Sequence, residues 1–342
     1  MGLVSLVRPG FGVDLGTANT VVCHPRRGVI LNEPSVMIVR PNGDRALEPV
    51  AVGAQARELM GRTPAGMEAV RPLRDGVITD LVAAKTFITA MLRRVPARPW
   101  EKLRPRAVIG IPAGATSLER QALLEAAEEA DLGRVHLIPE PIAGAVGAGL
   151  DPTATRAQMV VDVGGGTAEI TAFCFGGVLA SRSCRIAGDE MTAALSNYLR
   201  QEHGLLAGEI SVEDAKMSAG GGPGRNGSVR VEGRDAATGR PRFVDIKGTE
   251  VAAALQPTVD AIVEALTAAL AEDLPPQAVA DIMKDGVVGF GGGALLRGFG
   301  PRLEEALGFK VRVADEALVC VARGAAMCLS RPAILKAFSP PR

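Results

Sequence analysis

The chain contains one strand–turn–strand pattern twice, and this internal repeat constrains its fold more than any other feature. In each copy an apolar run ends in an aspartate, a turn rich in glycine and threonine follows, and a second apolar run comes next. Asp14 precedes the first turn, Gly-Thr-Ala-Asn-Thr, and Asp162 precedes the second, Gly-Gly-Gly-Thr. Short apolar runs separated by glycine turns are typical of β-strands. Two copies of one such unit predict two related lobes that face each other.

Strand and helix patterns alternate through the rest of the chain. The strand-like runs are 107–111, 135–138 and 287–290. One helical pattern runs from a capping box at Thr116 and Glu119 to Gly133, and a second begins at Pro141 with small residues suited to close packing. Two more lie at 250–272, where we expect an interruption at Pro257, and at 302–307. This alternation indicates an α/β protein. A length of 342 residues exceeds what one hydrophobic core normally organises, which also favours two lobes.

The charge balance and the few cysteines and histidines narrow the function classes. The chain has 38 basic and 38 acidic side chains, so it lacks the basic surplus that nucleic-acid binding normally requires, and we expect no nucleic-acid partner. Its five cysteines form no Cys-x-x-Cys pair and its three histidines are isolated, which predicts no zinc site and a reducing, cytoplasmic location. No apolar run reaches the ~18–20 residues that a membrane-spanning helix needs.

The two glycine-rich turns are candidate phosphate-binding loops. A turn after an apolar strand exposes backbone N–H groups, which can bind phosphate oxygens without a basic side chain. Asp14 and Asp162 would lie beside the phosphates, where a carboxylate is repelled unless Mg²⁺ or its water shell lies between them. The candidate phosphate contacts are Gly16, Thr17, Ala18 and Asn19 in the first loop and Gly164, Gly165, Gly166 and Thr167 in the second. Either turn alone is more often an ordinary hairpin, but the repeated pair favours a metal–nucleotide site.

Two further segments carry possible chemistry. The glycine-rich segment 289–297 follows a strand-like run, and consecutive glycines let a backbone lie flat against a planar group such as adenine. It fits neither a Walker A loop nor the Rossmann spacing. Glu140 stands between two prolines directly before a helical pattern. A carboxylate held there can orient or deprotonate a water that attacks a γ-phosphate, and an ordinary buried or capping glutamate is the alternative.

Two phosphate turns, an acidic residue between them and a late glycine-rich segment resemble the actin, Hsp70 and sugar-kinase superfamily, and most of all the MreB-type bacterial actins. The similar stretches span nearly the whole chain in the order of the family, which makes the set specific although each stretch alone is weak. They are 11–20, 31–36, 61–64, 71–78, 140–149, 161–167, 291–297 and 320–324.

This resemblance implies an α/β, actin-like fold, in which two related RNase H-like lobes enclose a nucleotide cleft and each carries a smaller subdomain. Lobe I would comprise 8–147, completed by the C-terminal 318–340, with a small subdomain at about 33–75. Lobe II would comprise 148–317, with a small subdomain at about 186–247.

The resemblance also implies a ligand and the residues that hold it. The cofactor would be ATP or GTP with Mg²⁺, the ion being held through water near Asp14 and Asp162. Glu140, helped by Thr167, would position the hydrolytic water of a slow ATPase. The ribose and adenine would contact Glu213, Asp214, Ala215 and Lys216 on one side and Gly291, Gly292, Gly293, Ala294, Leu295 and Leu296 on the other. Glu213 and Lys216 share a helix face, so an ordinary exposed ion pair is the alternative for them.

The chain departs from the family pattern beside these motifs. It has Pro139 before Glu140 where the family usually has a second acid, Ala168 where a Thr is usual, Ala187 where a Gly is usual, and Phe290 where a Thr is common. We expect nucleotide binding to survive, because the carboxylates of the site are kept. Phe290 would be bulky beside the adenosine site.

The resemblance finally implies a filament on the inner face of the cell membrane. Subunits would assemble head to tail, a heterologous contact that propagates instead of closing. Cell-wall synthesis proteins would be partners, and maintenance of cell shape would be the role. Trp100 and Leu103, in a basic proline-rich loop, are the candidate membrane contacts, with Leu3 and Leu6 as a second weak anchor that gains strength along a filament. A packed Trp100 is the alternative.

Three other functions are compatible with a superfamily fold. A small-molecule kinase would need a substrate pocket and a base aimed at a hydroxyl, and no segment of the sequence supplies them. An ATP-binding chaperone normally carries a separate peptide-binding domain, for which we see no segment. An actin-like scaffold for an organelle or a plasmid is poorly distinguished from a cell-shape protein by sequence.

Overall fold

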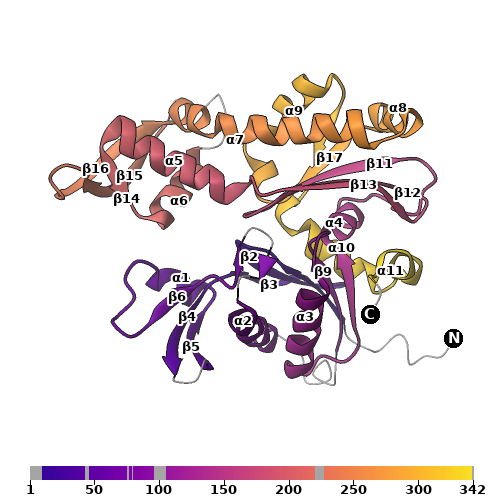
Figure 1. The fold of residues 1–342 in the computed structure, drawn as a ribbon, viewed down its shortest axis with the longest axis horizontal. Coiled ribbons are helices and arrows are strands. Elements are labelled where there is room, and N and C mark those ends of the chain that lie inside the picture. Colours follow the sequence, from indigo (N-terminus) through magenta and orange to yellow (C-terminus); the bar gives the residue numbers. More distant parts are fainter. Residues whose placement is uncertain are drawn as a thin grey trace.

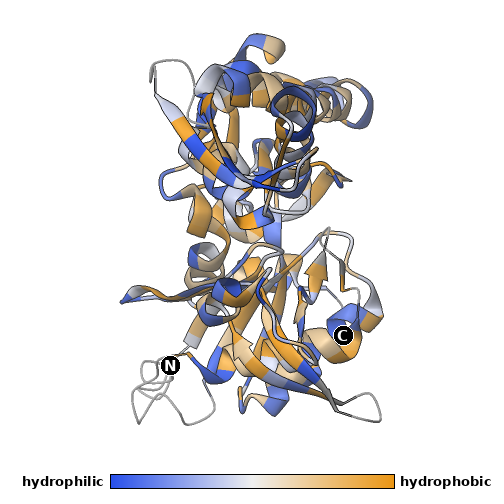
Figure 2. Cartoon of the chain, turned by 90° about the vertical axis from the view of Figure 1, so that its left-hand side faces the viewer, coloured by the Kyte–Doolittle hydropathy of each residue, from blue (hydrophilic) through white to orange (hydrophobic). Residues whose placement is uncertain are grey.

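The chain forms two lobes, one above the other in Figure 1. The computed structural model describes residues 10–42, 46–74, 77–78, 80–95, 105–219 and 227–340. We call the lower lobe, which holds most of the N-terminal half of the chain, lobe I, and the upper one lobe II. Figure 2, turned by 90°, shows hydrophobic segments inside each of the two lobes.

Lobe I is built on a five-stranded mixed sheet in the order β10-β9-β1-β2-β3. The neighbours β1, β2 and β3 pair antiparallel, whereas β9 runs parallel to β1 and β10 parallel to β9. The strands are β1 (Gly10–Leu15), β2 (Asn19–His24), β3 (Gly28–Pro34), β9 (Arg106–Ile111) and β10 (Val135–Pro139).

Lobe II repeats this topology with the order β13-β12-β11-β17-β18. Again the first three strands of the lobe pair antiparallel, and the last two run parallel to the central strand. The strands are β11 (Gln158–Val163), β12 (Ala168–Cys174), β13 (Gly177–Cys184), β17 (Val287–Phe290) and β18 (Val311–Val313). The predicted repeat is confirmed, because β11 and β12 occupy in lobe II the places of β1 and β2 in lobe I.

Each lobe inserts a three-stranded antiparallel sheet between its third and fourth core strands. In lobe I the inserted elements are β4 (Met37–Asn42), β5 (Ala46–Val52), α1 (Ala54–Leu59) and β6 (Glu68–Val70), followed by the short pair β7 (Leu73–Arg74) and β8 (Val77–Ile78). In lobe II they are α5 (Gly188–His203), β14 (Leu205–Ala207), α6 (Glu209–Ala219), β15 (Ser228–Asp235) and β16 (Pro241–Lys247). Both insertions lie at the same end of the molecule (Figure 1).

Helices cover the outer sides of the core sheets. Lobe I has α2 (Leu81–Arg93) and α3 (Ser117–Glu129), and lobe II has α7 (Gly248–Ala268), α8 (Pro276–Asp285) and α9 (Phe299–Leu307). The predicted capping box begins α3, since the Thr116 hydroxyl accepts from the Glu119 N–H and the Glu119 carboxylate accepts from the Thr116 N–H. The helix ends at Glu129, earlier than predicted, and Asp131 then turns the chain with a φ of 60°.

The predicted interruption at Pro257 is wrong, because α7 continues through it. Proline removes one i→i−4 hydrogen bond, but Pro257 and Ala253 are both exposed, so water can satisfy the free carbonyl. The opposite face of α7 packs Val251, Leu255 and Ile262 into the core of lobe II. Tertiary packing therefore outweighs the local effect of the proline.

With the π-helical turn Ala269–Asp273, α7 becomes a helix of 26 residues that is long and apolar enough, by length and composition alone, to cross a membrane. The sequence analysis expected no apolar run of the ~18–20 residues that a membrane-spanning helix needs, and this helix meets that test. Its packing against α5, α9 and β12 is that of a core helix in lobe II.

Two crossing helices join the lobes. α4 (Glu140–Gly147) contacts β9 and β10 of lobe I and β11 and β12 of lobe II, while α10 (Cys320–Cys328) covers β1, β2 and β9. Their backbones touch, since a Cβ at Gly324 would lie 1.7 Å from the carbonyl oxygen of Ala143, and a Cβ at Gly147 would lie 2.0 Å from that of Cys320. The predicted close packing of the small residues after Pro141 is therefore present. α11 (Pro332–Phe338) follows and packs against β10.

Candidate functional site

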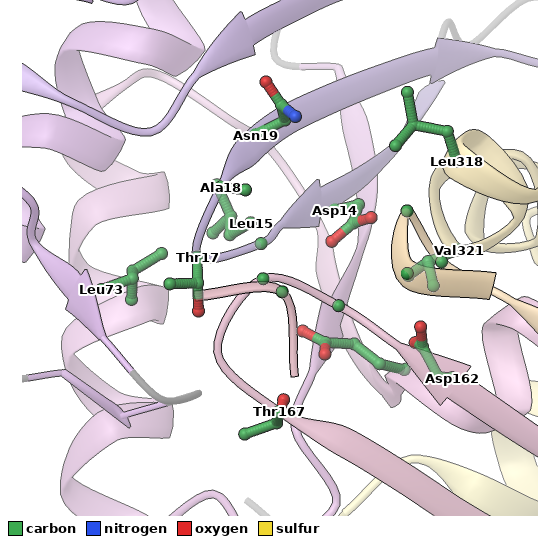
Figure 3. Close-up of a pocket in the computed structure, with 18 of the residues that line it drawn as sticks. Asp14, Leu15, Thr17, Ala18, Asn19, Leu73, Asp162, Thr167, Leu318 and Val321 are labelled. Carbon is green, nitrogen blue, oxygen red and sulfur yellow. The ribbon is translucent and has the colours of Figure 1, made fainter. Parts of the chain in front are cut away.

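A cavity of about 490 Å³ lies between the lobes, where the two glycine-rich turns face each other (Figure 3). Asp14 and the turn 15–19 line it from lobe I, and Asp162 with Gly164, Gly165 and Thr167 of the second turn lines it from lobe II. The volume is in the range of small-molecule and cofactor sites. A ligand here would contact both lobes at once.

The two turns touch each other. A Cβ at Gly165 would lie 3.0 Å from the Cβ of Ala18 and 3.2 Å from its backbone nitrogen, so the close approach depends on glycine. Within the second turn, the Gly164 N–H donates to the Thr167 carbonyl at 2.9 Å. The loops therefore form opposite walls of one cavity and not two separate hairpins.

The first turn is held by Ser35, which directly follows β3. Its hydroxyl donates to the Gly16 carbonyl at 2.6 Å, and its N–H donates to the Ala18 carbonyl at 2.9 Å. The Thr20 hydroxyl lies 3.0 Å from the Ser35 hydroxyl, and both side chains are buried. A neutral hydroxyl thus fixes the shape of the turn in lobe I.

The second turn is held by the start of α5 and by an ion pair on α6. The Gly188 N–H donates to the Gly164 carbonyl at 3.1 Å, and the Asp189 N–H donates to the Gly165 carbonyl at 2.7 Å. Lys216 donates to the Gly188 carbonyl at 2.8 Å and pairs with Glu213 at 2.7 Å. Both residues line the cavity, and Lys216 is only 6% exposed, so this pair is part of the cavity wall and not an ordinary surface ion pair.

The third glycine-rich segment closes the cavity beside Asp162. Gly291 has a φ of 85°, and a Cβ there would lie 2.5 Å from Asp162 Oδ1, so glycine is required for both conformation and space. The short 3₁₀ helix Gly293–Leu295 follows. Phe290 is fully buried and is absent from the cavity wall; a Cβ at Gly144 would lie 2.1 Å from its ring. The expectation of a bulky Phe290 beside the adenosine site is wrong, because β17 directs the ring toward α4.

Four carboxyl groups gather at the base of the cleft. Burial raises the pKa of Asp162 to about 7, and burial together with the charge of Asp162 raises the pKa of Asp14 to about 8. Burial, then the charges of Asp14, Glu169 and Asp162, raise the pKa of Glu140 well above its ordinary value. Burial and the charge of Asp162 raise the pKa of Glu169 to about 8. Like charges out of water resist ionisation, so the site favours a bound cation.

The donor set fits Mg²⁺, which prefers carboxylate, phosphate and water oxygens. Among the residues that the structure describes, no three or more histidine, cysteine, aspartate or glutamate side chains are arranged to hold a metal ion by themselves. Asp14 and Asp162 are therefore suited to a hydrated ion that takes its other ligands from water and phosphate.

Most residues predicted from sequence lie in the cavity wall. They are Asp14, Gly16, Thr17, Ala18, Asn19, Glu140, Asp162, Gly164, Gly165, Thr167, Glu213, Lys216, Gly291, Gly292, Gly293, Leu295 and Leu296. Figure 3 shows how Asp14, Thr17, Asp162 and Thr167 surround it.

Gly166, Asp214, Ala215 and Ala294 were predicted as ligand contacts but are not part of this wall. A helix places positions 213 and 216 on one face and the two residues between them on others. Ala215 accordingly packs in the core of lobe II, and Asp214 pairs with Arg57 of lobe I at 2.8 Å. The candidate membrane contacts Trp100, Leu103, Leu3 and Leu6 lie outside the described residues.

Several contacts of the site were not predicted from sequence. Arg71 of lobe I lies 2.5 Å from Glu209 and 3.8 Å from Asp189 of lobe II, and with the Arg57–Asp214 pair it connects the two insertions across the cleft. The roles of Ser35 and Glu169 were also missed. Their partners are far away in the chain, so no local pattern marks them.

Comparison with known proteins gives consistent matches over nearly the whole chain. The model of the MreB/Mbl protein family matches residues 8–337. The cell shape-determining protein MreB of Escherichia coli (strain K12) is 41% identical over 322 residues, which cover 93% of this chain and 92% of that protein. The cell shape-determining protein Mbl of Bacillus subtilis (strain 168) is 38% identical over 320 residues, covering 93% and 95%. Crystal structures of MreB5 of Spiroplasma citri bound to AMPPNP and to ADP each superpose with a TM-score of 0.86 at 30% identity, covering 95% of this chain and 97% of that one.

Proposed function

Since the chain belongs to the MreB/Mbl family and has an actin-like fold, we propose that it is an ATP-binding bacterial actin. It self-assembles into membrane-associated filaments and helps to maintain cell shape by guiding cell-wall synthesis. GTP is the alternative nucleotide.

The contact between the two glycine-rich turns carries this proposal. Gly165 of lobe II lies against Ala18 of lobe I, and each turn follows a strand whose penultimate residue is an aspartate that lines the cavity. A phosphate chain bound between the turns would contact both lobes, so its binding would depend on their relative position. The complexes of the related MreB5 with AMPPNP and ADP support a nucleotide as the ligand.

The proposed roles of the residues follow from their positions. Mg²⁺, when bound near Asp14 and Asp162, would neutralise the charge of the phosphates. Glu140 lines the cavity at the start of α4, and with Thr167 of the second turn it would orient the hydrolytic water. Glu213, Lys216 and the segment 291–296 would contact the nucleoside. The protein would be a slow ATPase.

The filament and its surroundings are the further part of the proposal. Head-to-tail contacts are heterologous and therefore propagate. Filaments would lie on the inner face of the cell membrane, in the cytoplasm, with Trp100, Leu103, Leu3 and Leu6 as membrane contacts. Membrane proteins of cell-wall synthesis would be the partners.

Sedimentation of the purified protein tests the proposal. It is measured with Mg-ATP, with Mg-ADP and without nucleotide, each with and without anionic vesicles. We expect nucleotide-dependent pelleting and co-sedimentation with vesicles, both abolished by Asp162→Ala. Glu202→Ala, which removes an exposed carboxylate from the same lobe, is the control and should pellet like the wild type.

A protein that binds ATP but stays in the supernatant under every condition would refute the filament. Phosphorylation of a panel of sugars and short acids would then test the kinase alternative.

A further inference from the structure

Glu169 makes a contact between the lobes at the base of the cleft. It lies on β12, opposite Asp162 in the register of β11 and β12, and is 3% exposed. Its two carboxyl oxygens lie 3.3 and 3.4 Å from the backbone nitrogen of Ala113, which donates to them. Ala113 belongs to lobe I, two residues beyond the end of β9. A side chain of one lobe therefore holds the backbone of the other.

The repeat shows that the fold does not require an acid at this position. In lobe I the residue opposite Asp14 is Val21, which is 1% exposed. The same place in the same topology is thus filled by a buried valine in one lobe and a buried glutamate in the other. Burying a carboxyl group is unfavourable compared with burying a valine. Glu169 therefore needs an explanation beyond packing.

The backbone that Glu169 holds lies between residues of the cavity wall. Gly110, Ile111, Pro112 and Ala115 all line the cavity, and Ala113 lies among them. A Cβ at Gly110 would lie 3.1 Å from Cγ of Glu140, so this segment also packs against the side chain proposed to orient water. We call residues 110–115 the floor segment.

We propose that Glu169 is a positioning residue that ties the floor segment of lobe I to β12 of lobe II and so keeps the cleft closed around the nucleotide. This inference rests on the proposed function. Glu169 does not line the cavity and would hold the cleft through the Ala113 N–H. The acceptor oxygen is what matters, so glutamine should replace it and valine should not.

Release of a fluorescent nucleotide measures this role in the full-length protein. Mg²⁺-bound N-methylanthraniloyl-ATP is preloaded, chased with excess ATP, and followed by stopped flow, with phosphate release recorded in parallel. Glu169→Val, which copies the valine of lobe I, removes the acceptor, and Ala113→Pro removes the donor from the other side. Thr171→Val is the matched control, because Thr171 is also buried on β12 but bonds to Ser181 within lobe II.

We expect Glu169→Val and Ala113→Pro each to speed nucleotide release at least about 10-fold, equivalent to about 1.4 kcal/mol. The double variant should be no faster than the faster single variant, since both remove one bond. Glu169→Gln, Thr171→Val and Ala113→Ser, which keeps the N–H, should stay within about threefold of the wild type.

Three results would overturn the inference. In the first, Glu169→Val releases nucleotide no faster than Thr171→Val. In the second, Glu169→Gln releases it as fast as Glu169→Val. In the third, the rate increases of the two single variants multiply in the double variant. A wild type without saturable nucleotide binding would instead refute the proposed function itself, and the inference with it.

Discussion

The hairpins β1–β2 and β11–β12 have the same place in their sheets, the same aspartate and the same kind of turn, yet their surroundings differ. Asp14 stands opposite Val21, and Asp162 opposite Glu169. The first turn is fixed by the Ser35 hydroxyl, while the second is fixed by the start of α5 and by Lys216. The shared aspartates and glycine turns line the cavity. Of the groups that differ, Val21 and Lys216 also line it, whereas Ser35 and Glu169 do not.

This difference separates the requirements of the ligand from those of each lobe. A carboxylate and a glycine turn on both sides suit one chain of phosphates and one cation between them. Lys216, which supports the second turn, pairs with Glu213, and both line the cavity together with the third glycine-rich segment. In the proposed complex, lobe II would therefore supply both phosphate and nucleoside contacts, whereas lobe I would supply mainly phosphate contacts.

The largest expected effect tests the equivalence of the two aspartates. Asp14→Ala and Asp162→Ala should each weaken Mg-ATP binding about 100-fold, or about 2.7 kcal/mol, by isothermal titration calorimetry. The loss should shrink in EDTA, because the carboxylates then only repel the phosphates. Neither variant should melt earlier than the wild type, since each removes a charge from a crowded site. Normal binding by one of the two would show that the aspartates are not equivalent.

The next largest effect should come from placing a glutamate in lobe I at the position that Glu169 has in lobe II. Val21→Glu should lower the free energy of unfolding by roughly 2 kcal/mol or more, because the new carboxyl is buried beside Asp14 without a partner. Urea denaturation measures the loss. Val178→Glu, at a half-exposed position of β13, is the control and should change it by less than about 0.5 kcal/mol. Equal stability of the two variants would contradict the difference that we draw between Val21 and Glu169.

The pH dependence of stability follows from the raised carboxyl pKa values. The unfolded chain releases these protons near pH 4, whereas the folded, nucleotide-free protein keeps those of Asp162 and Asp14 until their pKa values of about 7 and about 8. The folded state therefore binds more protons in between, and its stability falls as the pH rises. We expect the melting temperature to drop by roughly 3 °C or more from pH 5 to pH 8.5. Asp162→Asn should flatten this profile, and a rise with pH would contradict it.

Removing the two supports of the turns should have smaller and unequal effects. Lys216→Met should weaken ATP binding about 10-fold and Ser35→Ala about threefold, since hydrogen bonds from charged groups contribute more than neutral ones. Fluorescence titration with Mg-ATP compares them. A larger loss from Ser35→Ala would reverse the assignment of the stronger support to lobe II.

The ion pairs across the cleft should have the smallest effect. Arg57→Ala should lower the free energy of unfolding by less than about 1 kcal/mol, because both partners of the pair are partly exposed and screened. Arg71→Ala should lower the free energy of unfolding further, since Arg71 faces two acids and is less exposed than Arg57. High salt should remove the difference between the variants.

The amino-acid sequence by itself determined the repeat, the α/β class and most of the cavity wall. Strand endings at Asp14 and Asp162 and the glycine turns after them are local patterns, and backbone preferences act over a few residues. The capping box at Thr116 and the strand at 287–290 were predicted for the same reason. The charge balance, from which we predict no nucleic-acid partner, can likewise be counted without knowing the fold.

Only the tertiary structure decided which distant residues meet. The contact of Ser35 with the first turn depends on how the strands of lobe I pack. The contacts of Glu169 with Ala113 and of Asp214 with Arg57 depend on how the two lobes dock, and no local pattern encodes any of the three. Tertiary packing likewise places the Phe290 ring against Gly144 of α4, between the two lobes. The physical reason is that such contacts depend on the summed burial of whole elements, a quantity that exists only once both lobes are folded against each other.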